Sequence, residues 1–345
     1  MKRIILFRFH TDVDVCKNRL ALLRGYNPEI KIFGLFGGQE EELESFQLTL
    51  NPYLESIYCI RGKQPSWKRT HGDLAMRLWY QDIGKALDFD TLHYIEWDLL
   101  LFEPLEKMYG HIPENGVGLT SLTLLKDVEQ QWFWLSSEPL RTQWHDLLGF
   151  VKDKYGYDQE PLACEFPGAC IPRRFLEEYS NAEIPELCHD ELRIPLFSQI
   201  FNFPCYDTNL CKKQGDASER KFFNCDNKKI HLSAIHKELV KPSGKRAFHP
   251  VKKMFMFGKI ILLARKIGLL QEDVQSKKMV KYFLIHVFGL FLLALPEEEV
   301  SITPEIQNLL NLREKARVEK KWKLADEIRD QLLELGVSLH DKKLK

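Results

Sequence analysis

The chain has 345 residues, of which 44% are hydrophobic, and its 49 Lys and Arg balance its 49 Asp and Glu. This hydrophobic fraction is enough for a sizeable core, so intrinsic disorder is excluded as the main state. The balanced charge gives no indication of a nucleic-acid partner. The eight cysteines include no C-x-x-C pair, and the apolar run after Met1-Lys2-Arg3 is too short for a signal peptide. A cytoplasmic location is therefore expected.

The first hundred residues alternate strand and helix patterns. Apolar runs predict strands at residues 4–9, 31–36 and 56–60. Helical spacing of apolar residues predicts a helix around 16–23, which must end before Pro28, and another around 76–86. Strands that alternate with helices predict a parallel, doubly wound sheet with ligands at the carboxyl ends of its strands.

Residues 92–101 predict a buried strand that carries Glu96 and Asp98 two positions apart. Strand side chains alternate, so both acids should point one way and Trp97 the other. Buried charge costs several kcal/mol unless it is neutralised, and a divalent cation would neutralise both carboxylates. The alternative is a strand end where the acids meet solvent or arginines. Arg8, His10 and Lys63 also lie at the carboxyl ends of predicted strands and are candidates for the same site.

The next segments continue the mixed pattern. A strand is predicted at residues 116–124, a helix at 140–155, a turn at 166–172 and a helix at 173–179. The sequence His189-Asp190-Glu191 precedes a helix that is predicted to start at Pro195. Residues 207–229 are polar and predict irregular structure.

The composition changes after His249. Residues 251–281 hold eight Lys and Arg against two acids, and residues 282–295 are almost wholly apolar. Fourteen helical residues span about 21 Å, short of the roughly 30 Å of a bilayer core. Residues 251–298 are therefore expected to form basic and apolar helices that either lie on a membrane surface or pack on the domain or a second subunit.

The order of elements, with Glu96-Trp97-Asp98 after the fourth strand, resembles GT-A-type glycosyltransferases over about residues 1–255. The resemblance implies an α/β fold with a Rossmann-like mixed sheet flanked by helices, and a catalytic domain over residues 1–250 that binds a nucleotide sugar. It also implies a bound Mn²⁺ or Mg²⁺ that neutralises the leaving diphosphate. Asp98 would hold this metal. Glu96, where the family more often has Asp, would assist the metal or bind ribose.

The resemblance extends to further residues. The exits of the first and third strands, with Arg8, His10 and Lys63, fall where the family binds base, ribose and phosphate. Residues 166–176 look like its acceptor-side G-x-x-x-x-R-x-x-L segment. Asp190 or Glu191 would then be the general base in an inverting reaction, although Asp190 could instead only cap the following helix.

A late histidine is also expected from this resemblance. His236 and His249 both lie where the family has a metal-binding histidine, and only one of them is needed. His249 is favoured, since Lys252 stands close to it in sequence and could meet phosphate.

The C-terminal residues 299–345 predict a helical hairpin with Pro304 at the first helical position and Gly336 after the last. Residues 309–317, 320–332 and 335–337 resemble the C-terminal module of cysteinyl-tRNA synthetases, which helps to hold tRNA. The chain has no HIGH-like or KMSKS-like motif, so aminoacylation is not expected. Acids share the hairpin surface with its cations, which makes RNA a poor partner. Self-packing, oligomerisation or docking is the expected role.

Together these features predict a cytoplasmic enzyme, a metal-dependent glycosyltransferase. It would move a sugar from a nucleotide-sugar donor to a hydroxyl of an unknown glycan or lipid-linked acceptor. Peripheral attachment to a membrane and assembly into a homo-oligomer are left open. The alternative function is a nucleotide- or RNA-binding protein that works through the basic hairpin.

Overall fold

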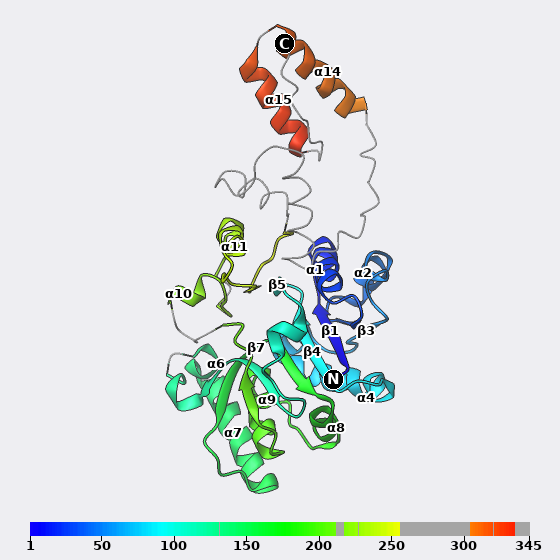
Figure 1. The fold of residues 1–345 in the computed structure, drawn as a ribbon. Helices are drawn as coiled ribbons and strands as arrows, with labels where there is room; N and C mark the ends of the chain where they lie inside the picture. Colours follow the sequence, from blue (N-terminus) through cyan, green and yellow to red (C-terminus); the bar gives the residue numbers. More distant parts are fainter. Residues whose placement is uncertain (131, 212–216, 227, 256–303, 320, 335–345) are drawn as a thin grey trace. The chain divides into compact units, whose positions relative to one another are not determined.

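A computed structural model describes the chain except for residues 131, 212–216, 227, 256–303, 320 and 335–345 (Figure 1). The chain divides into two compact units, Met1–Phe291 and Leu292–Lys345. The basic and apolar helices expected at residues 251–298 lie, from residue 256 onward, outside the described residues. The domain limits predicted at residues 250 and 298 stay predictions.

The first unit is built on a seven-stranded mixed sheet with the order β3-β2-β1-β4-β7-β6-β8. Its strands are β1 (Arg3–Phe9), β2 (Lys31–Phe36), β3 (Ile57–Cys59), β4 (Thr91–Glu96), β6 (Val117–Leu124), β7 (Leu162–Pro172) and β8 (Cys205–Asp207). All neighbouring strands are parallel except β7, which runs antiparallel to both β4 and β6. The predicted α/β class with a mixed sheet is confirmed.

Helices surround this sheet. They are α1 (Val13–Tyr26), α2 (Leu43–Leu50), α3 (Pro65–Thr70), α4 (Gly72–Asp82), α5 (Leu105–Tyr109), α6 (Phe133–Ser136), α7 (Glu138–Tyr155), α8 (Arg173–Asn181), α9 (Asp190–Ile200), α10 (Ala217–Arg220) and α11 (Leu232–Leu239). Short 3-10 turns lie at Glu40–Glu42, Gly84–Ala86 and Leu125–Asp127. A small second sheet pairs β5 (Leu100–Leu101) with β9 (Ala247–Phe248).

The alternation of side chains along β1 explains why helices cover both faces. Leu6 packs into a cluster with Trp79 of α4, whereas Phe7 packs into the opposite cluster with Leu20 of α1. Leu6 and Phe7 are fully buried. A strand that is apolar on both faces requires cover on both, as in doubly wound folds.

The strand predicted at residues 92–101 is interrupted. β4 ends at Glu96, and Trp97 and Asp98 form a turn before β5 begins at Leu100. The amide of Leu99 donates to the Glu96 carbonyl at 3.0 Å, which closes this turn. The inference that strand alternation aligns Glu96 with Asp98 was therefore wrong, and a turn brings the two acids together instead.

The turn predicted at residues 166–172 is also wrong, because these residues belong to β7. Gly168 has φ +81°, and the register between β6 and β7 shifts twice beside it. The Thr120 hydroxyl donates to the Pro167 carbonyl at 2.9 Å, and the Tyr109 hydroxyl donates to the Gly168 carbonyl at 2.9 Å. Side chains thus replace ladder bonds that the irregular strand loses.

Helix α9 begins at Asp190, not at the predicted Pro195, which lies inside the helix. His189 caps the helix, since its side chain accepts a hydrogen bond from the Glu191 amide at 3.3 Å. Proline at position 195 cannot donate to the Glu191 carbonyl. The Cys164 thiol donates to that carbonyl at 3.5 Å instead, which satisfies the group and lets the helix continue.

The described residues of the second unit form α14 (Pro304–Val318) and α15 (Trp322–Glu334). Ala316, Ala325 and Ile328 are buried. The predicted start of the hairpin at Pro304 is confirmed, whereas its predicted end at Gly336 lies outside the described residues. Within the part of the chain that the structure describes, no helix has the length and apolarity needed to cross a membrane.

Candidate metal centre and acid cluster

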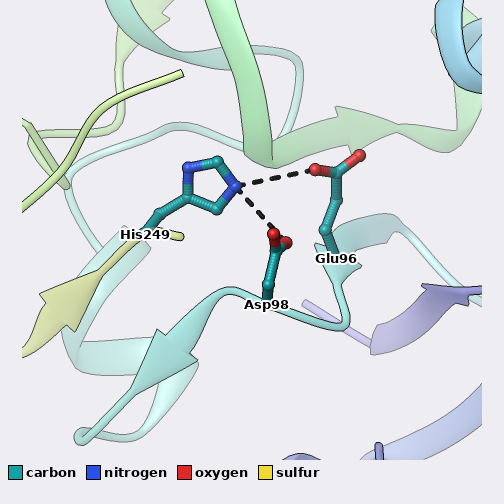
Figure 2. Close-up of side chains that lie close together, drawn as sticks. All are labelled: Glu96, Asp98 and His249. Atoms are coloured by element: carbon teal, nitrogen blue, oxygen red, sulfur yellow. Dashed lines mark ion pairs between the residues drawn. The ribbon is translucent and has the colours of Figure 1, made fainter. Parts of the chain in front are cut away.

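Three side chains converge just beyond the carboxyl end of β4. Glu96, Asp98 and His249 each offer one ligand atom, and these atoms all lie within 4.8 Å of one another (Figure 2). His249 Nε2 is 3.4 Å from Asp98 Oδ1 and 3.8 Å from Glu96 Oε2. Ligand atoms bound at about 2.1 Å around one ion stand about 3–4 Å apart, so the measured spacing suits a shared cation.

The small second sheet brings His249 to the acids across 150 residues of chain. Leu100 of β5 pairs with Phe248 of β9, which directly precedes His249. The Val251 amide donates to the Asp98 carbonyl at 2.8 Å, and the His249 amide donates to the Phe222 carbonyl at 3.0 Å. The backbone on both sides of the imidazole is therefore held by hydrogen bonds.

The imidazole of His249 is oriented by a second contact. Its Nδ1 lies 2.9 Å from the Asn224 carbonyl oxygen, which can only accept, so Nδ1 carries the proton. This leaves Nε2 directed at the two carboxylates. Metal-binding histidines use the same arrangement, in which one ring nitrogen binds a carbonyl and the other binds the ion.

The three groups influence one another's protonation. Burial, reinforced by the nearby Asp98, raises the pKa of Glu96 although Arg8 opposes this. Burial also disfavours the charged form of Asp98, but His249 outweighs it and holds the Asp98 pKa below its ordinary value. The two carboxylates raise the pKa of His249 against the effect of its burial. A proton on His249 thus supplies part of the positive charge that a cation would bring.

Arg8 lies inside the protein and not at an open ligand site. Its guanidinium donates to Glu96 Oε1 at 2.7 Å and to the carbonyls of Lys68 and Arg69. One oxygen of Glu96 is therefore fixed by Arg8, and the other faces His249. The expected alternative, an arginine that neutralises an acid, holds for Glu96, whereas the ion-pair partner of Asp98 is His249.

Arg8 also connects Glu96 to the acids of α9. Asp190 Oδ2 accepts a hydrogen bond from the Gly72 amide at 2.9 Å. A Cβ atom at Gly72 would lie 2.7 Å from Asp190 Oδ2 and from the Tyr94 hydroxyl, and 2.9 Å from Arg8 Nη1. Only glycine fits here, which shows how closely the cationic and acidic groups pack.

Asp190 and Glu191 differ in protonation although they are adjacent. Burial disfavours the charged form of Asp190, but His189, with Nδ1 2.6 Å from Oδ1, and Arg8 keep its pKa below the ordinary value. Burial and Asp190 raise the pKa of Glu191 well above its ordinary value. The Trp134 indole, stacked on His189 at 3.8 Å, donates to Glu191 Oε2 at 2.6 Å. The surroundings thus shift Asp190 towards its ionised form and Glu191 towards its protonated form.

Of the other residues predicted for the site, some lie near the cluster of Glu96, Asp98 and His249, and one pairs elsewhere. His10 stands edge-on to Trp97 at 5.4 Å. The charge of Lys252 lowers the pKa of Asp98, which places Lys252 near the three-residue cluster. Lys63 instead pairs with Glu186 at 2.7 Å.

His236 does not belong to the cluster of Glu96, Asp98 and His249. It is buried on α11, and its ring lies 4.9 Å from that of Phe255. Of the two candidate histidines, the fold brings His249 to the acids.

Two residues of this region were not predicted as part of this site from the sequence. Glu165 on β7 is buried and accepts a hydrogen bond from the Ser121 hydroxyl at 3.1 Å, and burial raises its pKa. Cys225 follows Asn224 in the segment that holds His249. Its thiol pKa is raised by burial and by nearby carboxylates, among them Glu165 and Glu191 as well as the acids of the cluster. One acid before a predicted turn and one cysteine in a polar segment do not indicate a site by themselves.

Comparison with known proteins gives two separate likenesses. Residues 300–345 match the family described as the cysteinyl-tRNA ligase anticodon binding domain. The cysteine--tRNA ligase of Coxiella burnetii (strain Dugway 5J108-111) is 54% identical over 37 residues, which are 11% of this chain and 8% of that ligase. The C-terminal resemblance noted in the sequence is confirmed for this segment, and the rest of the ligase has no counterpart in the match.

Three glycosyltransferases are among the solved structures that show a distant likeness to this chain. LgtC, a galactosyltransferase in complex with donor and acceptor sugar analogues, has a TM-score of 0.31 and 14% identity, over 59% of this chain and 66% of that one. The bifunctional glycosyltransferase WbbM has a TM-score of 0.37 and 9% identity, over 80% and 51%. Staphylococcus aureus TarS has a TM-score of 0.29 and 11% identity, over 54% and 31%. The chain spans less than two thirds of each, and no conclusion about its activity rests on these scores.

Proposed function

We propose that residues 1–255 form a metal-dependent glycosyltransferase that moves a sugar from a nucleotide-sugar donor to a hydroxyl acceptor. The observation that carries this proposal is the cluster of Glu96, Asp98 and His249 beyond a parallel strand end. Ligands of doubly wound sheets bind at that edge. Two carboxylates facing a histidine of fixed tautomer are ligands that can hold a divalent cation.

Asp98 and His249 would hold the metal, and the free oxygen of Glu96 would assist them. A bound divalent cation supplies Lewis-acid stabilisation for the negative charge of a departing diphosphate. Two oxygens and one imidazole nitrogen favour Mn²⁺ over Mg²⁺, since Mg²⁺ prefers oxygen ligands alone. Arg8 fixes the orientation of Glu96, a different role from the donor binding that its sequence position indicated.

The remaining roles follow from protonation and position. Asp190, whose pKa is lowered, would accept the proton of the acceptor hydroxyl, whereas Glu191, whose pKa is raised, would donate a hydrogen bond in its protonated form. Lys252 and His10 would contact the donor phosphates or ribose. Lys63 would join them only after it leaves Glu186.

The test is a thermal-shift screen of uridine, guanosine and cytidine diphosphosugars, each with and without Mn²⁺. A ligand that binds the folded state raises the melting temperature in proportion to the logarithm of its concentration over its Kd. One donor should stabilise the wild-type chain only when Mn²⁺ is present, and Asp98→Ala should abolish that shift. Stabilisation by a donor that is independent of both Mn²⁺ and Asp98 would refute the proposed centre.

A second candidate function rests on the C-terminal unit. Its likeness to an anticodon-binding domain favours RNA binding through exposed cations of α14 and the following turn, such as Lys315 and Lys321. In the full chain, Lys315→Glu with Lys321→Glu should weaken retention of transfer RNA on a filter and leave donor-induced stabilisation unchanged. Equal retention by the wild type and this variant would refute RNA binding through these cations.

A further inference from the structure

A groove of about 480 Å³ lies between α11 and the turn that follows α10, outside the acid cluster. One wall is a single face of α11 and its extension, since Ala234, Lys237 and Lys241 are spaced three and four residues apart. The floor includes Phe222 and Val240, and Lys221 stands at the opposite rim. The atoms exposed in the groove are almost all carbon, so the lysines present their methylene stems to it.

The rim carries an excess of positive charge. Glu238 is the acid that lines the groove, and Lys241 binds it at 2.7 Å. Lys221 and Lys237 form no ion pair among the described residues, and the Lys221 ammonium lies 5.0 Å from the Phe222 ring centre. Lys245, beside the same ring, is paired with Glu219 at 2.5 Å. Two unpaired ammonium groups therefore flank an apolar floor.

We propose that this groove binds an anionic phospholipid at a membrane surface. The apolar floor would take the first part of an acyl chain, and Lys221 and Lys237 would take the headgroup phosphate. Lysine is suited to this arrangement because its stem follows apolar surface while its ammonium group reaches the polar layer. A free phosphate would use only the rim and would leave the floor exposed to water.

The groove is linked to the segment that carries His249 by one backbone hydrogen bond. The carbonyl of Phe222, whose ring lines the groove, accepts the backbone hydrogen bond of His249 at 3.0 Å. A lipid in the groove would thus lie behind the segment that positions His249. The lipid-binding proposal does not depend on the proposed transferase activity, because it concerns binding alone.

The test is flotation of the full chain with vesicles of phosphatidylcholine, with and without phosphatidylglycerol. The wild type should float only with the anionic vesicles. Lys221→Gln with Lys237→Gln should lower the partition coefficient about thirtyfold, as expected for the loss of two lysines near an anionic surface. Val240→Asp, which keeps both lysines, should remove the binding that persists at high salt, since salt screens charge but not apolar contact.

The matched control is Lys31→Gln with Lys152→Gln, which changes the net charge equally at exposed positions on β2 and α7. This control should float like the wild type. If flotation fell equally in both double variants, the overall charge of the chain would account for vesicle binding. If it fell in neither, the vesicles would bind at another surface. Retention on an immobilised polyglutamate column without flotation would assign the groove to a protein partner. Each of these results would overturn the proposal.

Discussion

The acids at the end of β4 are half-buried (Glu96) and buried (Asp98), those at the start of α9 are both buried, and the surroundings of the two pairs differ. Asp190 and Glu191 already have close partners, with the Gly72 amide at 2.9 Å and the Trp134 indole at 2.6 Å. Asp98 and the free oxygen of Glu96 face one imidazole nitrogen at 3.4 and 3.8 Å. Asp190 and Glu191 thus each accept one hydrogen bond shorter than 3.0 Å, whereas Asp98 and Glu96 face the imidazole across longer separations.

Under the proposed function, this difference corresponds to two roles, proton transfer for one acid pair and metal binding for the other. Two adjacent acids whose pKa values are shifted in opposite directions suit proton transfer or acceptor positioning. Two carboxylates that stand 3.4 and 3.8 Å from the nitrogen of a histidine of fixed tautomer suit a metal cation. Arg8 lies between them and contacts Glu96 directly. The two acid pairs should therefore respond to mutation in separable ways.

The largest effect is expected for Asp98→Asn, which keeps the shape of the side chain but removes its charge. Transfer activity with the donor found in the screen should fall at least about a thousandfold, because metal binding contributes several kcal/mol to charge stabilisation. Steady-state kinetics at saturating Mn²⁺ measure this. Asp153→Asn on the exposed face of α7 is the matched control and should keep full activity.

Asp190→Asn should lower the rate by a factor of about 10²–10⁴, the range expected when a general base is lost. Unlike Asp98→Asn, it should leave the affinity for Mn²⁺ unchanged, because Asp190 is not a ligand of the cluster. Titration calorimetry with Mn²⁺ separates the two. A weakened Mn²⁺ affinity in Asp190→Asn would show that the two acid pairs act as one site.

His249→Ala should weaken Mn²⁺ binding by roughly a hundredfold, since it removes one ligand whose orientation the protein has fixed. His236→Ala serves as the comparison, because His236 packs against Phe255 and lies outside the cluster. Its Mn²⁺ affinity should equal that of the wild type in the same calorimetric titration. If His236→Ala weakened Mn²⁺ binding and His249→Ala did not, His236 and not His249 would be the metal ligand.

Gly72→Ala tests the packing between the two acid pairs. The added Cβ would meet Asp190, Tyr94 and Arg8 at distances below 3.0 Å. Overpacking of this kind costs about 1–3 kcal/mol in the free energy of unfolding, which denaturant titration measures. Gly149→Ala, where no atom lies within 4 Å of the added carbon, should be neutral or slightly stabilising.

The smallest effect is expected for Glu191→Gln. The folded chain keeps Glu191 protonated above the pKa of an unfolded glutamate, so the unfolded state binds fewer protons there. The free energy of unfolding should thus fall as the pH rises from about 4.5 towards the raised pKa. Glu191→Gln should flatten this fall in urea titrations at several pH values. Glu178→Gln, at an exposed position of α8, should leave this pH dependence of the free energy of unfolding unchanged.

Much of the fold could be predicted because its strands are apolar on both faces. Residues 4–9 and 31–36 read as buried strands, and β1 and β2 lie there. The errors arose where tertiary contacts replace local signals. Pro195 is accepted inside α9 because a thiol satisfies the carbonyl that it leaves free, and Pro167-Gly168 stays within β7 because two hydroxyls bind its carbonyls.

The candidate site was predictable in part for the same reason. Glu96 and Asp98 stand out because charge interrupts an apolar run, whereas the choice between His236 and His249 depends on the pairing of β5 with β9. The contacts of Arg8 with α3 and of Lys63 with Glu186, which precedes α9, join segments far apart in the sequence. Such contacts between distant segments leave no pattern in the local sequence.

The most direct test of the central claim is a crystal soaked in Mn²⁺ and measured at a wavelength where manganese scatters anomalously. The account predicts one strong anomalous peak within about 2.3 Å of Asp98 Oδ1 and His249 Nε2, with the free oxygen of Glu96 close by. A map without a peak there, with the His249 imidazole still directed at both carboxylates, would contradict it.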